Sequence, residues 1–159
     1  MVDEHDGPLE ARPPTLSDLV SLCRRLNDAQ ARYVVVGGMA VIQAGFVRAT
    51  EDIDLLVDAS PANIQRVRSA LATLPDGAAR ELADDDVQRY TVVRVADEFV
   101  IDLIGAACGV TYGDAHDAVE HVVIDGVSIP FATPELLWRT KQTVRDKDVL
   151  DRTFLARRI

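Results

Sequence analysis

Apolar and polar positions along the chain predict alternating helices and strands. Apolar residues recur at helical spacing after Thr15 to about residue 31, and again after Ser60 to about residue 74. Thr15 and Ser60 suit N-cap positions, and Pro61 suits a first helical position. Runs rich in β-branched and aromatic residues predict strands at residues 33–36, 52–57, 88–96, 99–104, 122–124 and 127–129.

The order of these elements predicts an α/β (α+β) fold, with a mixed sheet of about five strands flanked by helices. Two further helices are expected near the C-terminus, one beginning at Thr133-Pro134 and one around residues 149–155. Residues 1–14 are polar and contain three prolines, so we expect a flexible tail there. Residues 15–159 are expected to form a single domain, because a chain of 159 residues suffices for one core.

The stretch at 33–58 carries the most informative pattern, which predicts a strand, a glycine turn, a helix and a second strand. Gly37 and Gly38 lack β-carbons, so their backbone can approach a ligand closely, and the following helix would direct free N–H groups toward a phosphate. Asp52 and Asp54 lie two apart on the second strand, so their side chains point to one side. At an α-carbon separation of about 6.5–7 Å, two carboxylates can hold one hard cation such as Mg²⁺.

A third carboxylate stands within a later strand. Asp102 interrupts the apolar run at 99–104, where a carboxylate needs compensation from a metal ion or from a place at the rim of the sheet. Farther along, Lys141 and Arg145 lie four residues apart on one side of a predicted helix, and Asp148 follows in a charged stretch. A charged turn between two helices is the alternative interpretation of that stretch.

The order Gly37-Gly38, a helix, then Asp52-Ile53-Asp54 resembles the pattern of the nucleotidyltransferase superfamily, which includes DNA polymerase beta. The segment VVGGMAVIQAG…RATEDIDLLV is most similar to the small bacterial members of the superfamily. These include the AbiEii-like toxins and the lincosamide-type antibiotic nucleotidyltransferases. The chain departs from many members at Gly38, where they have a serine. The resemblance extends over residues 33–155, because Asp102 and the Lys/Asp-rich end also match.

This resemblance implies a nucleotidyltransferase that uses Mg²⁺ or Mn²⁺ and moves a nucleoside monophosphate from an NTP to an acceptor hydroxyl. It implies that Asp52, Asp54 and Asp102 bind the metal and catalyse transfer, with Asp102 also helping to deprotonate the acceptor. The residues that it places near the nucleotide phosphates are Gly37, Gly38, Lys141 and Arg48, with Asp148 as a further candidate.

Several acceptors and roles are open at this point. RNA or protein would be the acceptor if the chain belongs to a toxin–antitoxin system, in which case a cognate partner is expected. A small hydroxylated molecule would be the acceptor of an antibiotic-type enzyme. A catalytically silent module that binds or regulates within a protein complex is the main alternative to an enzyme. Gly38, and the absence from this sequence of the additional helical domain of longer toxins, favour that alternative.

Composition and charge limit the partners and the cellular location that we expect for this protein. The formal net charge of −9 argues against a broad nucleic-acid-binding surface, although a local basic patch would still hold RNA. No apolar run approaches the roughly 20 residues that a membrane span requires, and the first residues lack the features of a signal peptide. Two cysteines in the whole chain are typical of a reducing compartment. We therefore expect a cytoplasmic protein that does not enter a membrane.

Overall fold

The computed structural model describes residues 11–159, so the part of the expected tail at 1–10 lies outside the described residues. Just before the first helix, Arg12 pairs with Asp18 at 2.6 Å and with Glu98 at 3.0 Å. Its backbone N–H also donates to the Glu98 carbonyl oxygen. These contacts hold the segment before the first helix against a hairpin of the sheet.

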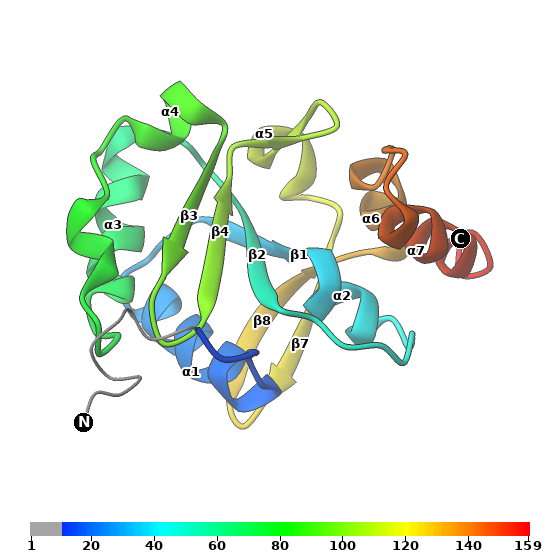
Figure 1. The fold of residues 1–159 in the computed structure, drawn as a ribbon, viewed down its shortest axis with the longest axis horizontal. Helices are drawn as coiled ribbons and strands as arrows, with labels where there is room; N and C mark the ends of the chain where they lie inside the picture. Colours follow the sequence, from blue (N-terminus) through cyan, green and yellow to red (C-terminus); the bar gives the residue numbers. More distant parts are fainter. Residues whose placement is uncertain (1–10) are drawn as a thin grey trace, which may run out of the picture.

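A mixed sheet of six strands forms the centre of the molecule (Figure 1), in agreement with the predicted sheet of about five strands. Its strand order is β3-β4-β2-β1-β8-β7, and β5 and β6 form a separate two-stranded sheet. The strands are β1 (Tyr33–Val36), β2 (Asp52–Val57), β3 (Val92–Ala96), β4 (Val100–Ile104), β5 (Ala106–Ala107), β6 (Val110–Thr111), β7 (Val119–Ile124) and β8 (Val127–Ala132).

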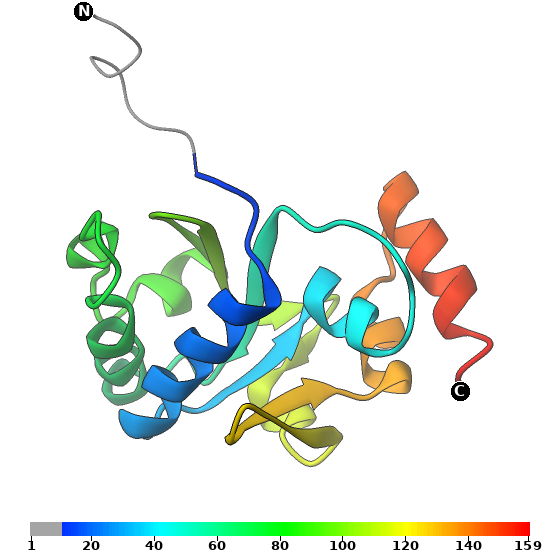
Figure 2. The same ribbon diagram turned by 90° about the horizontal axis from the view of Figure 1, so that it is seen from below.

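Seven α-helices and a 3₁₀ turn accompany the sheet in the described part of the chain, which confirms the predicted α/β class. They are α1 (Leu16–Asp28), α2 (Gly37–Gln43), α3 (Pro61–Leu71), the 3₁₀ turn η2 (Ala78–Glu81), α4 (Asp86–Tyr90), α5 (Tyr112–Ala115), α6 (Pro134–Thr140) and α7 (Asp146–Leu155). Helices α1 and α3 pack side by side, whereas α6 and α7 lie together near α2 at the other end of the molecule (Figures 1 and 2).

The predicted helix starts are confirmed by their caps. The Thr15 hydroxyl accepts a hydrogen bond from the Asp18 backbone N–H, and the Asp18 carboxylate accepts one from the Thr15 N–H. This reciprocal capping box satisfies two of the N–H groups that the start of a helix leaves free. Ser60 caps α3 ahead of Pro61, and Thr133 caps α6.

One sequence-based strand boundary is wrong. Residues 88–90 belong to α4 and not to a strand, and Thr91, at a φ of +64°, separates this helix from β3. The helix α2 spans Gly37–Gln43, but Gly37 at its first position has a φ of +66°, which is a left-handed turn conformation and not a right-handed helical one. The predicted glycine turn therefore lies at the very start of this helix.

The end of α6 is also earlier than the apolar spacing predicts. That spacing continues to Val144, but the helix ends at Thr140. Arg152 of α7 donates to the carbonyl oxygens of Lys141 and Thr143. These bonds replace those that a longer helix would make, so tertiary contacts with α7 determine where α6 ends.

Strand register brings the acidic residues together. Strands β2 and β4 pair in parallel with Asp54 opposite Asp102, and β1 runs antiparallel to β2 with Val36 opposite Asp54. The strands that carry the three acids are therefore neighbours in the sheet. Because side chains alternate along a strand, Ile53 is fully buried in the core, whereas Asp54 on the opposite face is partly accessible.

The core lies between the sheet and the helices that cover it. Fully buried side chains come from α1, α3 and the central strands, and examples are Leu19, Leu26, Ile64, Leu55 and Ile101. Within residues 11–159, no helix is both long enough and apolar enough to cross a membrane.

Candidate metal centre

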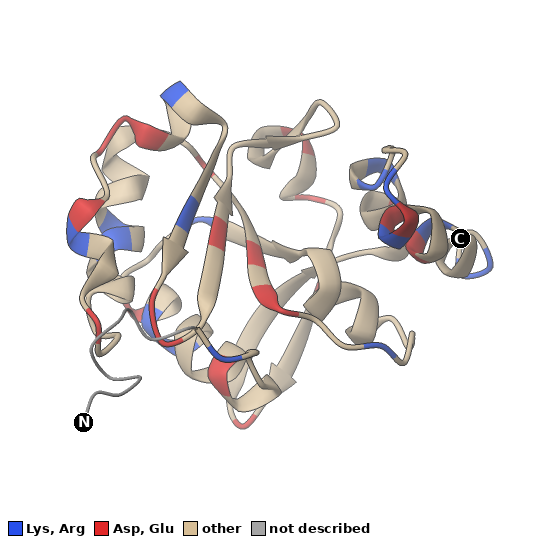
Figure 3. Cartoon of the chain, in the orientation of Figure 1, with Lys and Arg blue, Asp and Glu red and all other residues tan. Residues whose placement is uncertain are grey.

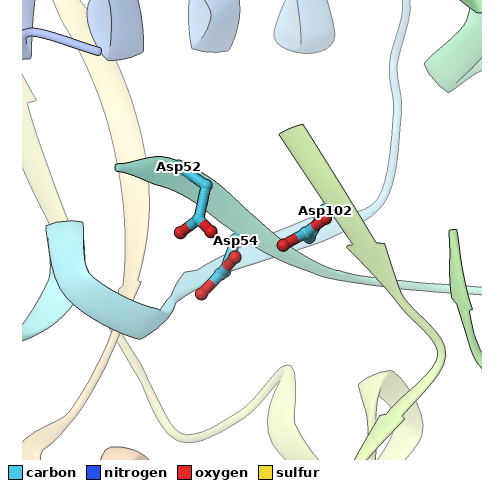
Figure 4. A group of neighbouring side chains, drawn as sticks. All are labelled: Asp52, Asp54 and Asp102. Atoms are coloured by element: carbon cyan, nitrogen blue, oxygen red, sulfur yellow. The ribbon is translucent and has the colours of Figure 1, made fainter. Parts of the chain in front are cut away.

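Three carboxylates converge where β2 and β4 lie side by side (Figure 4). One oxygen from each of Asp52, Asp54 and Asp102 lies within 4.8 Å of the other two. Asp52 and Asp54 share one side of β2, and Asp102 enters from the neighbouring strand in register with Asp54. The structure thus brings together the three acids that the sequence singled out.

Asp54 is the least compensated of the three acids. Ion pairs reach Asp52 and Asp102, whereas within residues 11–159 none reaches Asp54. Burial, together with the negative charges of Asp52 and Asp102, raises the pKa of Asp54 to about 7, and nearby lysines oppose this rise only in part. A bound cation would favour the ionised carboxylate and so lower the pKa of Asp54 again.

The glycine pair leaves space that side chains would fill. Gly37 has a φ of +66°, and a β-carbon built there would lie 2.0 Å from Asp54 Oδ2. A β-carbon at Gly38 would lie 2.4 Å from Thr50 Oγ1 and 3.2 Å from Arg48 Nη2. Gly37 therefore places bare backbone directly against an acid of the centre, and a serine at position 38 would require Thr50 to move.

Arg94, on β3, is a site residue that the sequence reasoning missed. Its Nε donates to Asp102 Oδ1 at 2.9 Å and its Nη2 donates to Asp102 Oδ2 at 3.0 Å. The same Nη2 lies 3.5 Å from Asp52 Oδ2. Asp102, followed by Asp52, raises the pKa of the Arg94 guanidinium, so this cation is firmly part of the acidic cluster.

A hairpin loop explains why Arg94 was missed. A two-residue turn at Asp97-Glu98 would place Val93 opposite Asp102. In the structure Ala96 pairs with Val100, so the loop contains three residues and the pairing shifts by one. That shift places an arginine, in place of a valine, opposite the third acid.

Two of the cations expected near the phosphates are held in buried ion pairs. Lys141 Nζ lies 2.9 Å from Asp151 Oδ2 and 3.4 Å from Asp148 Oδ1, and all three residues are buried. Arg48 Nη2 lies 3.0 Å from the same Asp151 oxygen. Asp148 also accepts from Arg145 Nε at 3.2 Å. Asp151 thus joins Lys141 to Arg48.

A pocket of about 200 Å³ adjoins the acids. Asp54 and Gly37 form part of its wall, and the turn after α6 contributes Lys141, Arg145 and Asp148. Arg48 does not line this pocket and lies instead beside Gly38. A larger pocket of about 290 Å³ lies at the opposite end of β1 and contains none of the three acids, so size alone does not identify the site.

The donor set fits a hard divalent cation. All three groups offer carboxylate oxygens, which suit Mg²⁺, Mn²⁺ and Ca²⁺, and no thiolate or imidazole belongs to the cluster. Carboxylate clusters occur in proteins of many activities, so the triad defines a class of cation and not one reaction.

No family model matches the sequence, and no curated protein is significantly similar to it. The residues and geometry of the chain itself therefore carry any assignment of function.

Proposed function

We propose that the protein is a metal-dependent nucleotidyltransferase that moves a nucleoside monophosphate from an NTP to an acceptor hydroxyl. The observation that carries this proposal is the convergence of Asp52, Asp54 and Asp102 beside a pocket bounded by Gly37. Bound Mg²⁺ or Mn²⁺ would supply charge stabilisation for the attacking and leaving oxygens of the transfer.

Each acid has a distinct place in this scheme. Asp52 and Asp54 would hold the cation from one strand, since their carboxylates lie on the same face of β2. Asp102 would complete the oxygen set and orient the acceptor hydroxyl for loss of its proton. Gly37 and Gly38 would admit the terminal phosphates, because side chains there would collide with Asp54 and Thr50.

Lys141 would act through its charge and not as a mobile arm. Asp148 and Asp151 fix its ammonium group at the pocket wall, where it offsets negative charge on the departing pyrophosphate. Arg145 lines the same wall with a largely exposed side chain, so it is the cation better placed to contact phosphate directly. Arg48, whose Nη2 lies beside Gly38, would help to hold that glycine in position.

An RNA acceptor is favoured over a small molecule by the charge of the last two helices. The chain is acidic as a whole, yet basic residues are frequent along α6, α7 and the segments next to them (Figure 3). Those with exposed side chains are Arg139, Arg145, Lys147, Arg157 and Arg158. Such a local patch suits a polyanion. We place the activity in the cytoplasm, where NTPs are available and where Cys23 and Cys108 stay reduced.

The test supplies each α-labelled NTP separately, with Mg²⁺, total RNA and lysate protein. Label should enter RNA with the wild type and not with Asp54→Asn. Asp28→Asn, the same chemical change at an exposed residue of α1, should transfer label normally. Equal labelling by the Asp54 variant would overturn the assignment, and label on protein alone would make protein the acceptor and point to a toxin–antitoxin pair.

A catalytically silent nucleotidyltransferase-like module is the second candidate, and a specific observation favours it. Arg94 engages two of the acids, and Lys141 and Arg48 are already neutralised by Asp151. Such a module would act by binding a protein partner. Calorimetry with Mg²⁺ and each NTP separates the candidates, because a module would show no nucleotide binding at millimolar concentration.

A further inference from the structure

We propose that Arg94 is an internal counter-ion of the acidic centre, which competes with the divalent cation for Asp102. In the metal-free protein the guanidinium holds Asp102, and cation binding displaces it. The inference rests on the proposed function in one respect only, namely that a cation binds among the three acids.

The bonding of Asp102 is the first reason. Both of its oxygens accept from Arg94, at 2.9 and 3.0 Å, in the forked geometry that arginine and carboxylates favour. Each oxygen keeps a further lone pair, but the guanidinium charge at this carboxylate lowers its affinity for a second cation. Asp102 therefore becomes a stronger metal ligand, or a better acceptor for a substrate proton, when Arg94 moves away.

The exposed fractions of the side chains place Arg94 on the solvent side of the acidic centre. The Arg94 side chain is 61% exposed, whereas those of Asp102 and Asp52 are 12% and 18% exposed. The guanidinium thus covers the acids from the solvent side, and its departure would leave no empty space in the core. Arg48 provides the contrast, since its side chain is only 14% exposed and is held by the fully buried Asp151.

The charges of the groups predict how Arg94 and the cation affect each other at Asp102. Three ionised carboxylates carry three negative charges, and Arg94 neutralises one of them, mainly at Asp102. A dication placed while the guanidinium remained would meet a like charge within a few ångströms of the same oxygens. Cation binding and the Arg94–Asp102 pair therefore oppose each other, and removing the guanidinium should strengthen cation binding.

The measurement is the affinity of the nucleotide-free protein for Mn²⁺, followed by electron paramagnetic resonance and by calorimetry. Arg94→Gln should bind Mn²⁺ about fivefold more tightly than wild type, as expected when an ion pair of this exposure no longer has to break. Arg94→Lys, which keeps the charge but loses the fork, should lie between the two. Arg25→Gln, at an exposed arginine of α1, is the matched control and should bind as wild type does.

A double-mutant cycle separates competition from a purely structural role. Asp102→Asn should weaken Mn²⁺ binding only slightly in the wild-type background, where Arg94 already engages this acid. In the Arg94→Gln background the same change should weaken binding several-fold more, because Asp102 is then a free ligand. Unchanged or weaker binding by folded Arg94→Gln, or additive effects in the cycle, would overturn the inference.

The outcomes also distinguish this inference from the proposed function. Tighter Mn²⁺ binding by Arg94→Gln with no nucleotide transfer by any variant would support the counter-ion and refute the enzyme. If the wild type transfers nucleotide but Arg94→Gln binds Mn²⁺ no more tightly than wild type, the enzyme would be supported and the counter-ion refuted. Failure of every variant to bind Mn²⁺ at millimolar concentration would refute both.

Discussion

Gly37 shows how much a single missing β-carbon contributes at this site. Its φ of +66° is a conformation that glycine adopts without strain, and the space beside it is occupied by Asp54. Because the acid and the glycine lie on neighbouring segments of the sheet and α2, neither can move without disturbing the other.

Gly37→Ala should therefore cost more stability than an alanine at another glycine of similar φ. Gly126 has a φ of +78°, and a β-carbon there would meet nothing within 4 Å, so Gly126→Ala should cost only the backbone strain of about 1–2 kcal/mol. Gly37→Ala adds the collision with Asp54 and should unfold at a lower denaturant concentration and bind Mn²⁺ more weakly. Equal free energies of unfolding for the two variants would contradict the close approach.

Asp54→Asn should stabilise the metal-free protein. The folded-state pKa of Asp54, about 7, lies above the ordinary value of 3.8, so the folded protein binds more protons than the unfolded chain between these pH values. Wild-type stability should fall as pH rises through that window, and the variant should not share this loss. In a chelator at pH 8, its free energy of unfolding should exceed that of wild type by at least about 1 kcal/mol, roughly one pKa unit.

Denaturant unfolding at pH 4 and pH 8, with and without Mg²⁺, checks this prediction. The advantage of the variant should largely disappear at pH 4, which lies well below the folded-state pKa of Asp54 and close to its unfolded value, and Mg²⁺ should stabilise wild type alone. A variant less stable than wild type at pH 8 would mean that burial of the Asp54 charge, together with repulsion from the other two acids, does not dominate the stability effect of this residue.

At the scale of elements, one buried acid holds α7 against the rest of the site. Asp151 of α7 pairs with Lys141 after α6 and with Arg48 in the loop before β2. Among the described residues, 11–159, no hydrogen-bond partner reaches one buried oxygen of Asp151 or the buried Nε of Arg48, so the network is costly to build and sensitive to change.

Asp151→Asn should lower the free energy of unfolding by about 3–5 kcal/mol, because it leaves buried cations without their counter-charge. Asp146→Asn, on the same helix but exposed, should change it by no more than about 0.5 kcal/mol. Thermal and denaturant unfolding of both variants measure the difference. Similar small losses in both would show that the ion pairs of Asp151 contribute little.

At the scale of the whole molecule, the pocket joins segments from most of the chain. Gly37, Asp54, Cys108 and Lys141 all line it, although they are far apart in sequence. Cys108 is exposed, whereas Cys23 is fully buried and its burial raises the thiol pKa to about 12. Since the thiolate is the reactive form, the two cysteines should differ sharply in reactivity.

A thiol reagent should therefore modify Cys108 rapidly in the native protein and Cys23 only after denaturation. If the pocket binds nucleotide, Mg²⁺ and NTP together should slow the modification of Cys108. The same addition to Asp54→Asn should give no protection. Protection that persists in this variant, or rapid labelling of Cys23 in the native protein, would contradict the arrangement described for the pocket.

Local chemistry made much of this molecule predictable from its sequence. Thr15, Ser60 and Thr133 cap helices through short-range hydrogen bonds, so the residues themselves determine where these helices begin. Side-chain alternation on a strand likewise determined that Asp52 and Asp54 face one side. An acid within an apolar strand was sufficient to single out Asp102.

Tertiary structure alone decided the remaining features, because they depend on partners distant in sequence or on a one-residue shift. The length of a hairpin loop places Arg94, and not Val93, opposite Asp102. Contacts with α7 end α6 at Thr140 and turn Lys141 into a buried, paired cation. Periodicity reports which face of an element is apolar, but not which charge lies across from it. The sequence thus determined the strands, the caps and the three acids, and the packing decided which cations accompany them.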